Sequence, residues 1–139
     1  NISVTLDTEH ALPIPTYSLG SCLSKDGESI LIFGGYTKYG SSNKVYKYNA
    51  KTGEYASQTN MPCLSYGFKV TKTPDNKVIA IGFCNNYYYI YDEYTNKWET
   101  KTIPNIKIGS YTQITFDNNG NLHVIGGSYD PICHYICEW

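Results

Sequence analysis

Three histidines, His10, His123 and His134, are the side chains of this sequence best suited to acid or base catalysis, because imidazole changes charge near neutral pH. None has an acidic or nucleophilic neighbour at a spacing typical of a catalytic pair. The chain also lacks a Gly-x-Ser-x-Gly elbow, a phosphate-binding loop and a His-x-x-x-His pair, which are common signatures of enzyme sites. We therefore expect no catalytic residues, and we expect His123 to be a packed, hydrogen-bonded histidine of a core or channel.

Carboxylates and cysteines indicate no further chemistry. The acidic residues lie mostly where turns are expected, and Asp is a common turn residue: Asp26, Asp75, Asp92 and Asp117. The cysteines are five, so at least one is free or pairs with another chain: Cys22, Cys63, Cys84, Cys133 and Cys137. Cys133 and Cys137 would lie on one face of a strand about 13 Å apart, too far for a disulfide. Since no Cys-x-x-Cys pair exists, we expect free thiols that fill gaps between sheets, no metal and no cofactor.

An apolar stretch that ends in glycine occurs three times and organises the chain. The copies are residues 30–36, 78–84 and 122–128. The spacing is 48 residues from Gly34 to Gly82 and 44 residues from Gly82 to Gly126. A period of this length is typical of propellers and solenoids.

The flanks of the copies agree with one another. An apolar-Pro pair and a small-Tyr-small triplet precede each copy, and a tyrosine-rich alternating run follows residues 30–36 and 78–84. In this order the motifs resemble the kelch repeat, whose unit has a strand ending in Gly-Gly, a Tyr-Asp strand and a tryptophan a few residues later. The resemblance covers nearly the whole chain, with departures at Phe83 in place of the second glycine, Tyr55 in place of a tryptophan and Cys137 in place of a tyrosine. The chain also lacks the arginine common near the start of kelch units.

The resemblance implies an all-β fold, a β-propeller of kelch type with one four-stranded blade per unit. The three units, about residues 12–60, 61–102 and 103–139, form one kelch-repeat region across residues 1–139. Residues 1–11, whose first six residues alternate apolar and polar, are expected to supply the outer strand of a neighbouring blade. The structural motif residues are then Gly34, Gly35, Gly82, Gly126, Gly127, Trp98 and Trp139.

Three blades cannot close a ring, because propellers typically have about 4 to 8 blades. The unpaired strand expected at the start and the missing outer strand of the third unit are complementary. Two explanations stay open. The chain is either part of a larger propeller, or one half of a homodimer that builds six blades.

Composition excludes several classes of partner. The net charge is −1, and the 11 cationic residues are all lysines scattered along the sequence, whereas nucleic acids and anionic membrane surfaces select clustered cations. No apolar run approaches the roughly 18 residues of a membrane span. We therefore expect no nucleic acid partner and no membrane insertion.

Tyrosine is the more informative residue type, with 15 among 139 residues. Its ring combines a large apolar face with a hydroxyl, which suits protein recognition and also sugar stacking. The candidate binding residues are three tyrosines that the kelch resemblance places near the mouth of the innermost strands and three on loops: Tyr17, Tyr66, Tyr111, Tyr36, Tyr39 and Tyr129. The alternative for Tyr17, Tyr66 and Tyr111 is that they only satisfy hydrogen bonds between blades.

The sequence therefore predicts a non-enzymatic interaction module whose loop face binds another protein, since relatives of the kelch type often act as adaptors or scaffolds. One alternative is a carbohydrate-binding or enzymatic propeller, either oxidase-like or isomerase-like. That class requires convergent ligands in a channel, which a chain without arginine supplies poorly. A second alternative is a structural blade element of a larger assembly.

Overall fold

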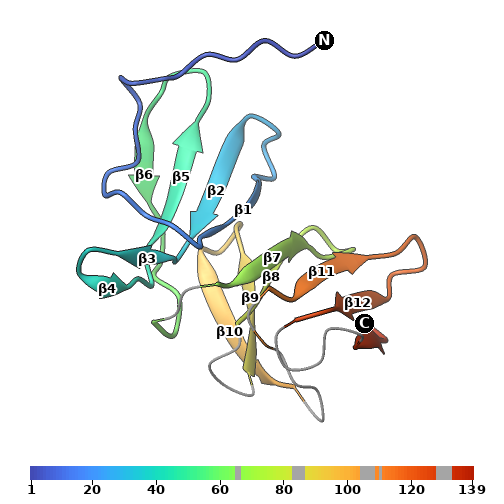
Figure 1. Cartoon of the computed structure of the whole chain (residues 1–139). Coiled ribbons are helices and arrows are strands. Elements are labelled where there is room, and N and C mark those ends of the chain that lie inside the picture. The colour runs from blue at the N-terminus through green and yellow to red at the C-terminus, as the bar shows by residue number, and fades with distance from the viewer. Residues whose placement is uncertain (65–66, 83–86, 104–108, 110, 128–132) are drawn as a thin grey trace.

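The computed structural model describes residues 1–64, 67–82, 87–103, 109, 111–127 and 133–139. These residues form strands and turns and contain no helix, so the expected all-β class is confirmed (Figure 1). No helix that could span a membrane is found among them. The strands are short, as expected from the alternating apolar stretches between turn residues.

The strands form three antiparallel sheets and one small hairpin. Sheet 1 contains β1 (Gly20–Leu23), β2 (Ser29–Phe33), β5 (Val45–Asn49) and β6 (Tyr55–Ser57). Sheet 2 contains β7 (Lys69–Lys72), β8 (Val78–Ile81), β9 (Tyr87–Asp92) and β10 (Lys97–Thr102). Sheet 3 contains β11 (Gln113–Phe116), β12 (Leu122–Ile125) and β13 (His134–Cys137), and the hairpin contains β3 (Tyr36–Thr37) and β4 (Gly40–Ser41).

Tight turns join the first two strands of each sheet, as their Asp, Asn and Gly residues predict. In sheet 1 the Asp26 carboxylate accepts hydrogen bonds from the backbone N–H groups of Glu28 and Ser29, each at 2.8 Å. In sheet 3 the Asp117 carboxylate accepts from the backbone N–H groups of Asn119 and Asn121. These side chains fix the turns and with them the strand register.

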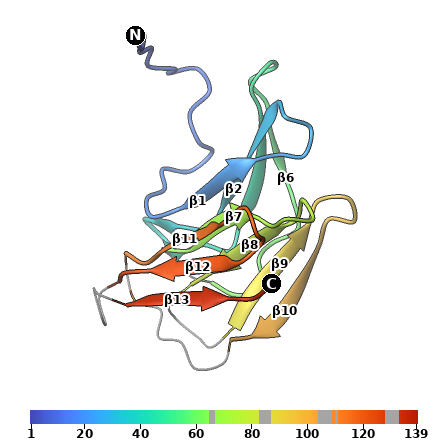
Figure 2. The same ribbon diagram turned by 90° about the vertical axis from the view of Figure 1, so that its right-hand side faces the viewer.

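The three sheets lie in sequence order, and the first strand of each lies beside the first strand of the next. β7 contacts both β1 and β11, and Figure 2 shows the three strands together. A hollow of about 170 Å³ lies where these strands begin, with Gly20, Lys69 and Gln113 in its wall. The sheets therefore diverge from a shared line of first strands.

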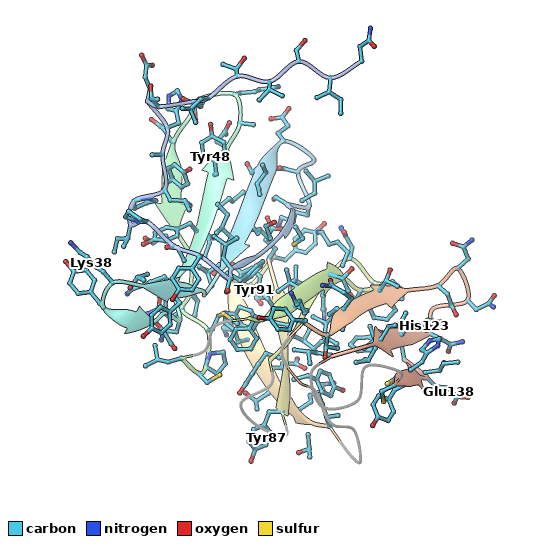
Figure 3. The ribbon with its side chains drawn as sticks, viewed as in Figure 1. Lys38, Tyr48, Tyr87, Tyr91, His123 and Glu138 are labelled. Atoms are coloured by element: carbon cyan, nitrogen blue, oxygen red, sulfur yellow. The ribbon has the colours of Figure 1, made fainter. Side chains whose placement is uncertain are left out.

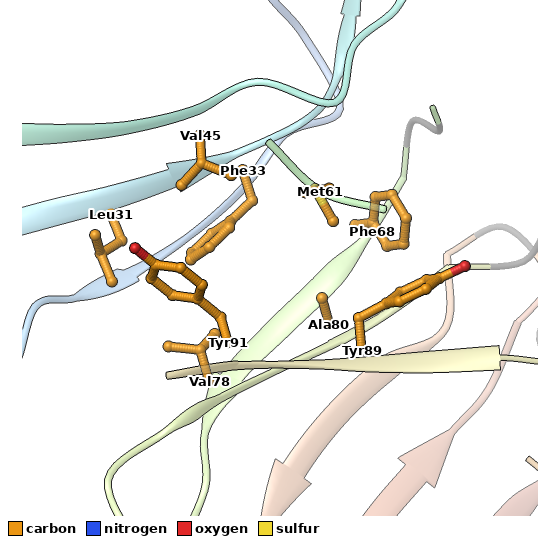
Figure 4. Close-up of a cluster of buried hydrophobic side chains, with 9 residues drawn as sticks. All are labelled: Leu31, Phe33, Val45, Met61, Phe68, Val78, Ala80, Tyr89 and Tyr91. Atoms are coloured by element: carbon orange, nitrogen blue, oxygen red, sulfur yellow. The ribbon is translucent and has the colours of Figure 1, made fainter. Parts of the chain in front are cut away.

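Apolar side chains fill the space between successive sheets. Leu31 and Phe33 of β2 belong to a cluster with Val78 and Ala80 of β8 (Figure 4). The other two residues of β8, Ile79 and Ile81, pack with Leu122 and Val124 of β12. Sheet 2 is therefore buried on both faces, between sheet 1 and sheet 3.

Both tryptophans lie against neighbouring aromatic rings. The Trp98 ring centroid lies 5.8 Å from that of Phe33 in sheet 1 and 4.9 Å from that of Tyr91 in its own sheet. The indole N–H of Trp98 also donates a hydrogen bond to the carbonyl oxygen of Thr59, at 3.0 Å. Trp139 contacts Tyr88 of sheet 2 and Phe116 of sheet 3. Trp98 and Trp139 thus contribute to packing between sheets.

A buried carboxylate joins sheets 1 and 2. The side chain of Glu93, directly after β9, is only 4% exposed and lies 3.3 Å from the Lys47 ammonium. It also accepts hydrogen bonds from the Ser24 hydroxyl and from the backbone N–H of Lys25. Burial raises the pKa of the Glu93 carboxyl, but the hydrogen bonds from Ser24, Lys25 and Lys47 outweigh burial, and the pKa is lowered from 4.5.

The start of the chain does not pair within the described structure. Residues 1–7 form no strand, and the side chains of Ile2, Val4 and Leu6 are 92%, 89% and 84% exposed. Sheet 3 has three strands among the described residues, and no closed ring is present in that part of the chain. The expectation that residues 1–11 supply the outer strand of a neighbouring blade stays a prediction.

Replacing Glu93 with alanine is expected to destabilise the fold by about 2–4 kcal/mol. The substitution leaves the Ser24 hydroxyl and the Lys25 N–H at a buried site without their acceptor. Urea unfolding measures the change. Glu99→Ala is the matched control, because Glu99 is exposed and its contact with Lys101 is 3.8 Å long, so its loss is expected to cost less than about 0.5 kcal/mol. Equal effects of the two substitutions would contradict the structural role of Glu93.

The contribution of Glu93 is also expected to depend on pH. Because its folded-state pKa lies below the ordinary value of 4.5, the stabilisation is present at neutral pH and is lost as the pH falls through the folded-state pKa. The stability difference between wild type and Glu93→Gln should therefore shrink between about pH 7 and about pH 3. Urea unfolding across this range measures the difference, and a constant difference would contradict the lowered pKa.

Candidate functional site

Two of the candidate tyrosines lie side by side at the end of sheet 1. The backbone N–H of Tyr17 donates to the carbonyl oxygen of Tyr36 at 3.1 Å, and the N–H of Tyr36 donates back to Tyr17 at 2.8 Å. Their ring centroids are 5.4 Å apart, with the ring planes tilted by 45°. The Tyr17 side chain is nevertheless 62% exposed. The pair thus presents a fixed aromatic surface to solvent.

The double glycine after β2 makes this close approach possible. Gly35 has a φ of +100°, and a Cβ at this position would lie 2.5 Å from Thr16 Cγ2 and 2.9 Å from the Tyr17 carbonyl oxygen. Any other residue would be strained by both its backbone conformation and its contacts. Gly127 occupies the same place after β12, with a φ of +117° and Thr112 against its Cα. The Gly-Gly motif therefore positions the tyrosine segments that precede sheet 1 and sheet 3.

Tyr39 lies on the β3–β4 hairpin that extends from the same end of sheet 1. The Thr37 hydroxyl holds the hairpin turn, because it donates to the Gly40 carbonyl at 3.2 Å and accepts from the Tyr39 N–H at 3.1 Å. The Tyr39 side chain is 77% exposed, with the Lys38 ammonium 5.0 Å from its ring centroid. Tyr17, Tyr36, Tyr39 and Lys38 are called the tyrosine face below.

A hollow of about 550 Å³ lies at the tyrosine face. Its wall is formed by Pro15, Thr16, Tyr17, Tyr36, Thr37 and Lys38. Lys38 is the charged residue of this wall. The hollow therefore combines apolar and aromatic walls with a positive charge, which is suited to binding rather than to proton transfer.

The other candidate tyrosines are separate from this group. Tyr111 is exposed, has a φ of +68° and lies in the segment that leads into β11 of sheet 3. Tyr66 and Tyr129 lie outside the described residues. The alternative in which Tyr17, Tyr66 and Tyr111 only satisfy hydrogen bonds between blades stays a prediction.

The remaining motif residues lie at the ends of the second strands. Gly34 and Gly126 have φ values of +59° and +73°, like the glycines that follow them. Gly82 differs, because its φ is outside the left-handed region and a Cβ there would lie 2.7 Å from the Phe68 ring. Phe83, the residue that replaces the second glycine, lies outside the described residues.

Two histidines and an aspartate form a hydrogen-bonded chain that the sequence did not reveal. His123 Nε2 lies 2.8 Å from Asp117 Oδ2, and His123 Nδ1 lies 2.8 Å from His134 Nε2. Figure 3 shows His123 in sheet 3. The hydrogen bond from His123 and the N–H groups of Asn121 and Asn119 lower the pKa of the Asp117 carboxyl. The expectation of a hydrogen-bonded His123 is confirmed. Its partners, Asp117 and His134, are brought beside it by the pairing of β12 with β11 and β13.

The sequence could have indicated the hydrogen bonds of His123 only if the register between β11, β12 and β13 had been known. Asp117 and His123 lie on either side of the turn between β11 and β12, and His134 is a diagonal neighbour of His123 on β13. The contacts form a line through the His123 ring and do not converge on one point. No group of three His, Cys, Asp or Glu that could hold a metal is found among the described residues.

The thiols in the described part of the chain are not arranged for chemistry. Cys22, Cys133 and Cys137 are free thiols. Burial raises the pKa of Cys22 to about 11 and also raises the pKa of Cys137. Since the thiolate is the reactive form, Cys22 and Cys137 are filling groups at the sheet interfaces, as expected. Cys84 lies outside the described residues.

The hydrogen-bonded chain predicts the proton positions of both rings. With both rings neutral, His123 must carry its proton on Nε2 to donate to the Asp117 carboxylate, so Nδ1 accepts from His134 Nε2–H. Long-range ¹H–¹⁵N NMR of the neutral rings is expected to show the Nε2–H tautomer for both histidines. In Asp117→Asn this preference of His123 should weaken, while His10, which contacts Asp7, is the unchanged control. A protonated Nδ1 on neutral His123 would contradict the arrangement.

Comparison with known proteins adds no family to this description. No protein-family model matches the chain, and no curated protein matches its sequence.

Proposed function

We propose that the chain is a kelch-type β-propeller module, without enzymatic activity, that binds another protein through the tyrosine face. The fold part of this proposal is supported by the two four-stranded antiparallel sheets, the shared line of first strands and the glycine pairs after β2 and β12. Each sheet then corresponds to one blade, with sheet 3 contributing three of its four strands. The four-stranded blade is the unit from which propellers are built.

The observation that carries the binding function is the exposure of Tyr17, in the wall of the 550 Å³ hollow, and of Tyr39 on the adjoining hairpin. An exposed tyrosine ring buries a large apolar area when a partner covers it, and its side chain has few rotamers to lose. Each such tyrosine therefore contributes strongly to the free energy of binding. Tyr17 is held by its backbone bridge to Tyr36, and Tyr39 is held on a hydrogen-bonded hairpin. A surface held in place in this way loses little conformational entropy when it binds.

A carbohydrate is the second candidate ligand, because the solvent-facing ring of Tyr17 beside a hollow is also a surface on which a sugar ring can stack. An enzymatic propeller is less well supported. The titratable chain formed by Asp117, His123 and His134 lies in sheet 3, whereas the hollow lies at the end of sheet 1. We therefore assign binding to the tyrosine face and no catalysis to the histidines.

Replacing Tyr17 or Tyr39 with alanine is expected to weaken partner binding about 30-fold each, since an aromatic residue at the centre of an interface contributes about 2 kcal/mol. The partner is first identified by chemical crosslinking from Lys38→Cys, and its affinity for each variant is then measured by titration calorimetry. Tyr94→Ala is the matched control, because Tyr94 is equally exposed but lies on the turn between β9 and β10.

The same variants separate the two candidate ligands. If the module binds a sugar, the wild type binds on a glycan array and Tyr17→Ala loses that signal. If Tyr17→Ala and Tyr39→Ala bind the crosslinked protein as tightly as Tyr94→Ala does, the tyrosine face is not the binding surface.

A further inference from the structure

The residues of each second strand alternate between the preceding and the following sheet. Phe33, Ile81 and Ile125 are equivalent, because each ends its strand before glycine and pairs with the first residue of β1, β7 or β11. Phe33 faces sheet 2, and Ile81 faces sheet 3. Ile125 must therefore face the side on which a following sheet would lie.

The open side of sheet 3 carries exposed apolar side chains beside His123 and His134. Ile125 is 44% exposed, whereas its equivalents Phe33 and Ile81 are fully buried. Ile136 is exposed on the same side of sheet 3. It pairs with His123 on β12, and His123 lies two residues before Ile125, so all three side chains share one face. The side of sheet 3 that bears Ile125 and Ile136 is called the trailing face.

The open side of sheet 1 is the one on which a preceding sheet would lie. Ile30 is equivalent to Val78 and Leu122, which face the preceding sheet and are buried. Ile30 itself is 38% exposed, and Leu23, its partner in the β1–β2 register, is exposed as well. The side of sheet 1 that bears Leu23 and Ile30 is called the leading face.

We propose that two copies of this chain associate head to tail, so that the leading face of each copy packs on the trailing face of the other. The contact then repeats the packing that the chain already uses between sheets 1 and 2 and between sheets 2 and 3. Two copies supply six sheets, which is within the range of about 4 to 8 blades for a closed propeller. Two-fold symmetry closes the ring, since each copy provides one leading and one trailing face.

A second observation supports a copy of this chain as the occupant. The segment 1–6 carries three exposed apolar side chains in alternation, Ile2, Val4 and Leu6. It leaves from sheet 1, because the Tyr55 hydroxyl on β6 donates to the His10 carbonyl at 2.8 Å. A copy that seats its leading face on sheet 3 therefore brings this segment to that sheet at the same time.

Sheet 3 has a place for such a segment. Within the described residues β13 pairs only with β12, so its outer edge has unpaired backbone groups. An apolar cavity of about 350 Å³ lies beside that strand, with Tyr88, Ile103, Tyr135 and Trp139 in its wall. Segment 1–6 of the second copy would add the fourth strand at this edge and cover the cavity. In both views the start of the chain lies far from the end of its own sheet 3 (Figures 1 and 2), so the segment does not pair with its own β13.

The test is sedimentation of the 139-residue chain at several concentrations, with circular dichroism as the measure of folding. A folded dimer is expected. Ile30→Asp on the leading face and Ile125→Asp on the trailing face should each raise the dissociation constant at least about 100-fold, because both contacts of a symmetric dimer then contain a buried carboxylate. Leu64→Asp is the matched control, since Leu64 is exposed between β6 and β7 and lies on neither face.

Mixing the two aspartate variants gives the decisive result. A mixed dimer joins the intact trailing face of Ile30→Asp to the intact leading face of Ile125→Asp through one normal contact. The other contact carries both aspartates and stays open, so the mixed dimer is expected to be weaker than the wild-type dimer but tighter than the dimer of either variant alone. Deleting residues 1–6 should also weaken the dimer, because β13 loses its added strand. If either aspartate variant is unfolded, Leu23→Asp or Ile136→Asp replaces it on the same face.

Four outcomes would overturn the proposal. They are a folded wild-type monomer at every concentration, a complex larger than two copies, aspartate variants that dimerise as tightly as Leu64→Asp does, and two folded monomeric variants that remain monomeric when mixed. None of these results depends on the tyrosine face, which lies on the β3–β4 hairpin and on the segment before β1 and is tested separately by Tyr17→Ala and Tyr39→Ala.

Discussion

The burial of the second strand on both faces is the constraint on which the rest of this structure depends. Val78, Ile79, Ala80 and Ile81 of β8 are all buried, two toward sheet 1 and two toward sheet 3. Each of the larger side chains contributes about 1.5–3 kcal/mol when it leaves water. β8 alone would expose these side chains on both faces, so sheet 2 depends on both of its neighbours for burial.

One position shows how the contacts between sheets are made specific. The residue after the third strand is Ala50 in sheet 1 and Glu93 in sheet 2, and the matching place in sheet 3 is Trp139, two residues beyond β13. Glu93 reaches back to the turn of sheet 1, and Trp139 reaches back to Tyr88 of sheet 2. Sheet 1 has alanine at this place. The same backbone position therefore carries a carboxylate that bonds to the preceding sheet, an aromatic ring that packs on it, or an alanine. Apolar packing is the feature that the contact between sheets 1 and 2 shares with the contact between sheets 2 and 3.

Much of the fold could be predicted because its determinants are local. The apolar stretches before Gly34, Gly82 and Gly126 became β2, β8 and β12, and the Asp, Asn and Gly residues between strands became turns. Glu93 could not be recognised, because its partner Ser24 lies 69 residues away in the sequence. The chain from Asp117 through His123 to His134 was missed for the same reason, since a one-residue change of register would have turned His123 to the opposite face. Residues 1–6 alternate as a strand does but pair with no strand in the described structure. An alternating sequence indicates a strand but does not indicate which strand it pairs with.

The tyrosine face could be predicted as a set of residue types but not as an arrangement. The kelch resemblance placed Tyr17 near the mouth of an innermost strand, and the sequence placed Tyr36 and Tyr39 on a loop. The backbone bridge between Tyr17 and Tyr36 joins these two segments. That bridge requires Gly35, because a side chain there would displace the Tyr17 backbone. The glycine motif is thus needed both for ending the strand and for holding the exposed tyrosine. The hairpin beyond it contributes no residue to the two apolar clusters found among the described residues. The proposed binding surface therefore lies on segments that Gly35 allows to approach each other closely.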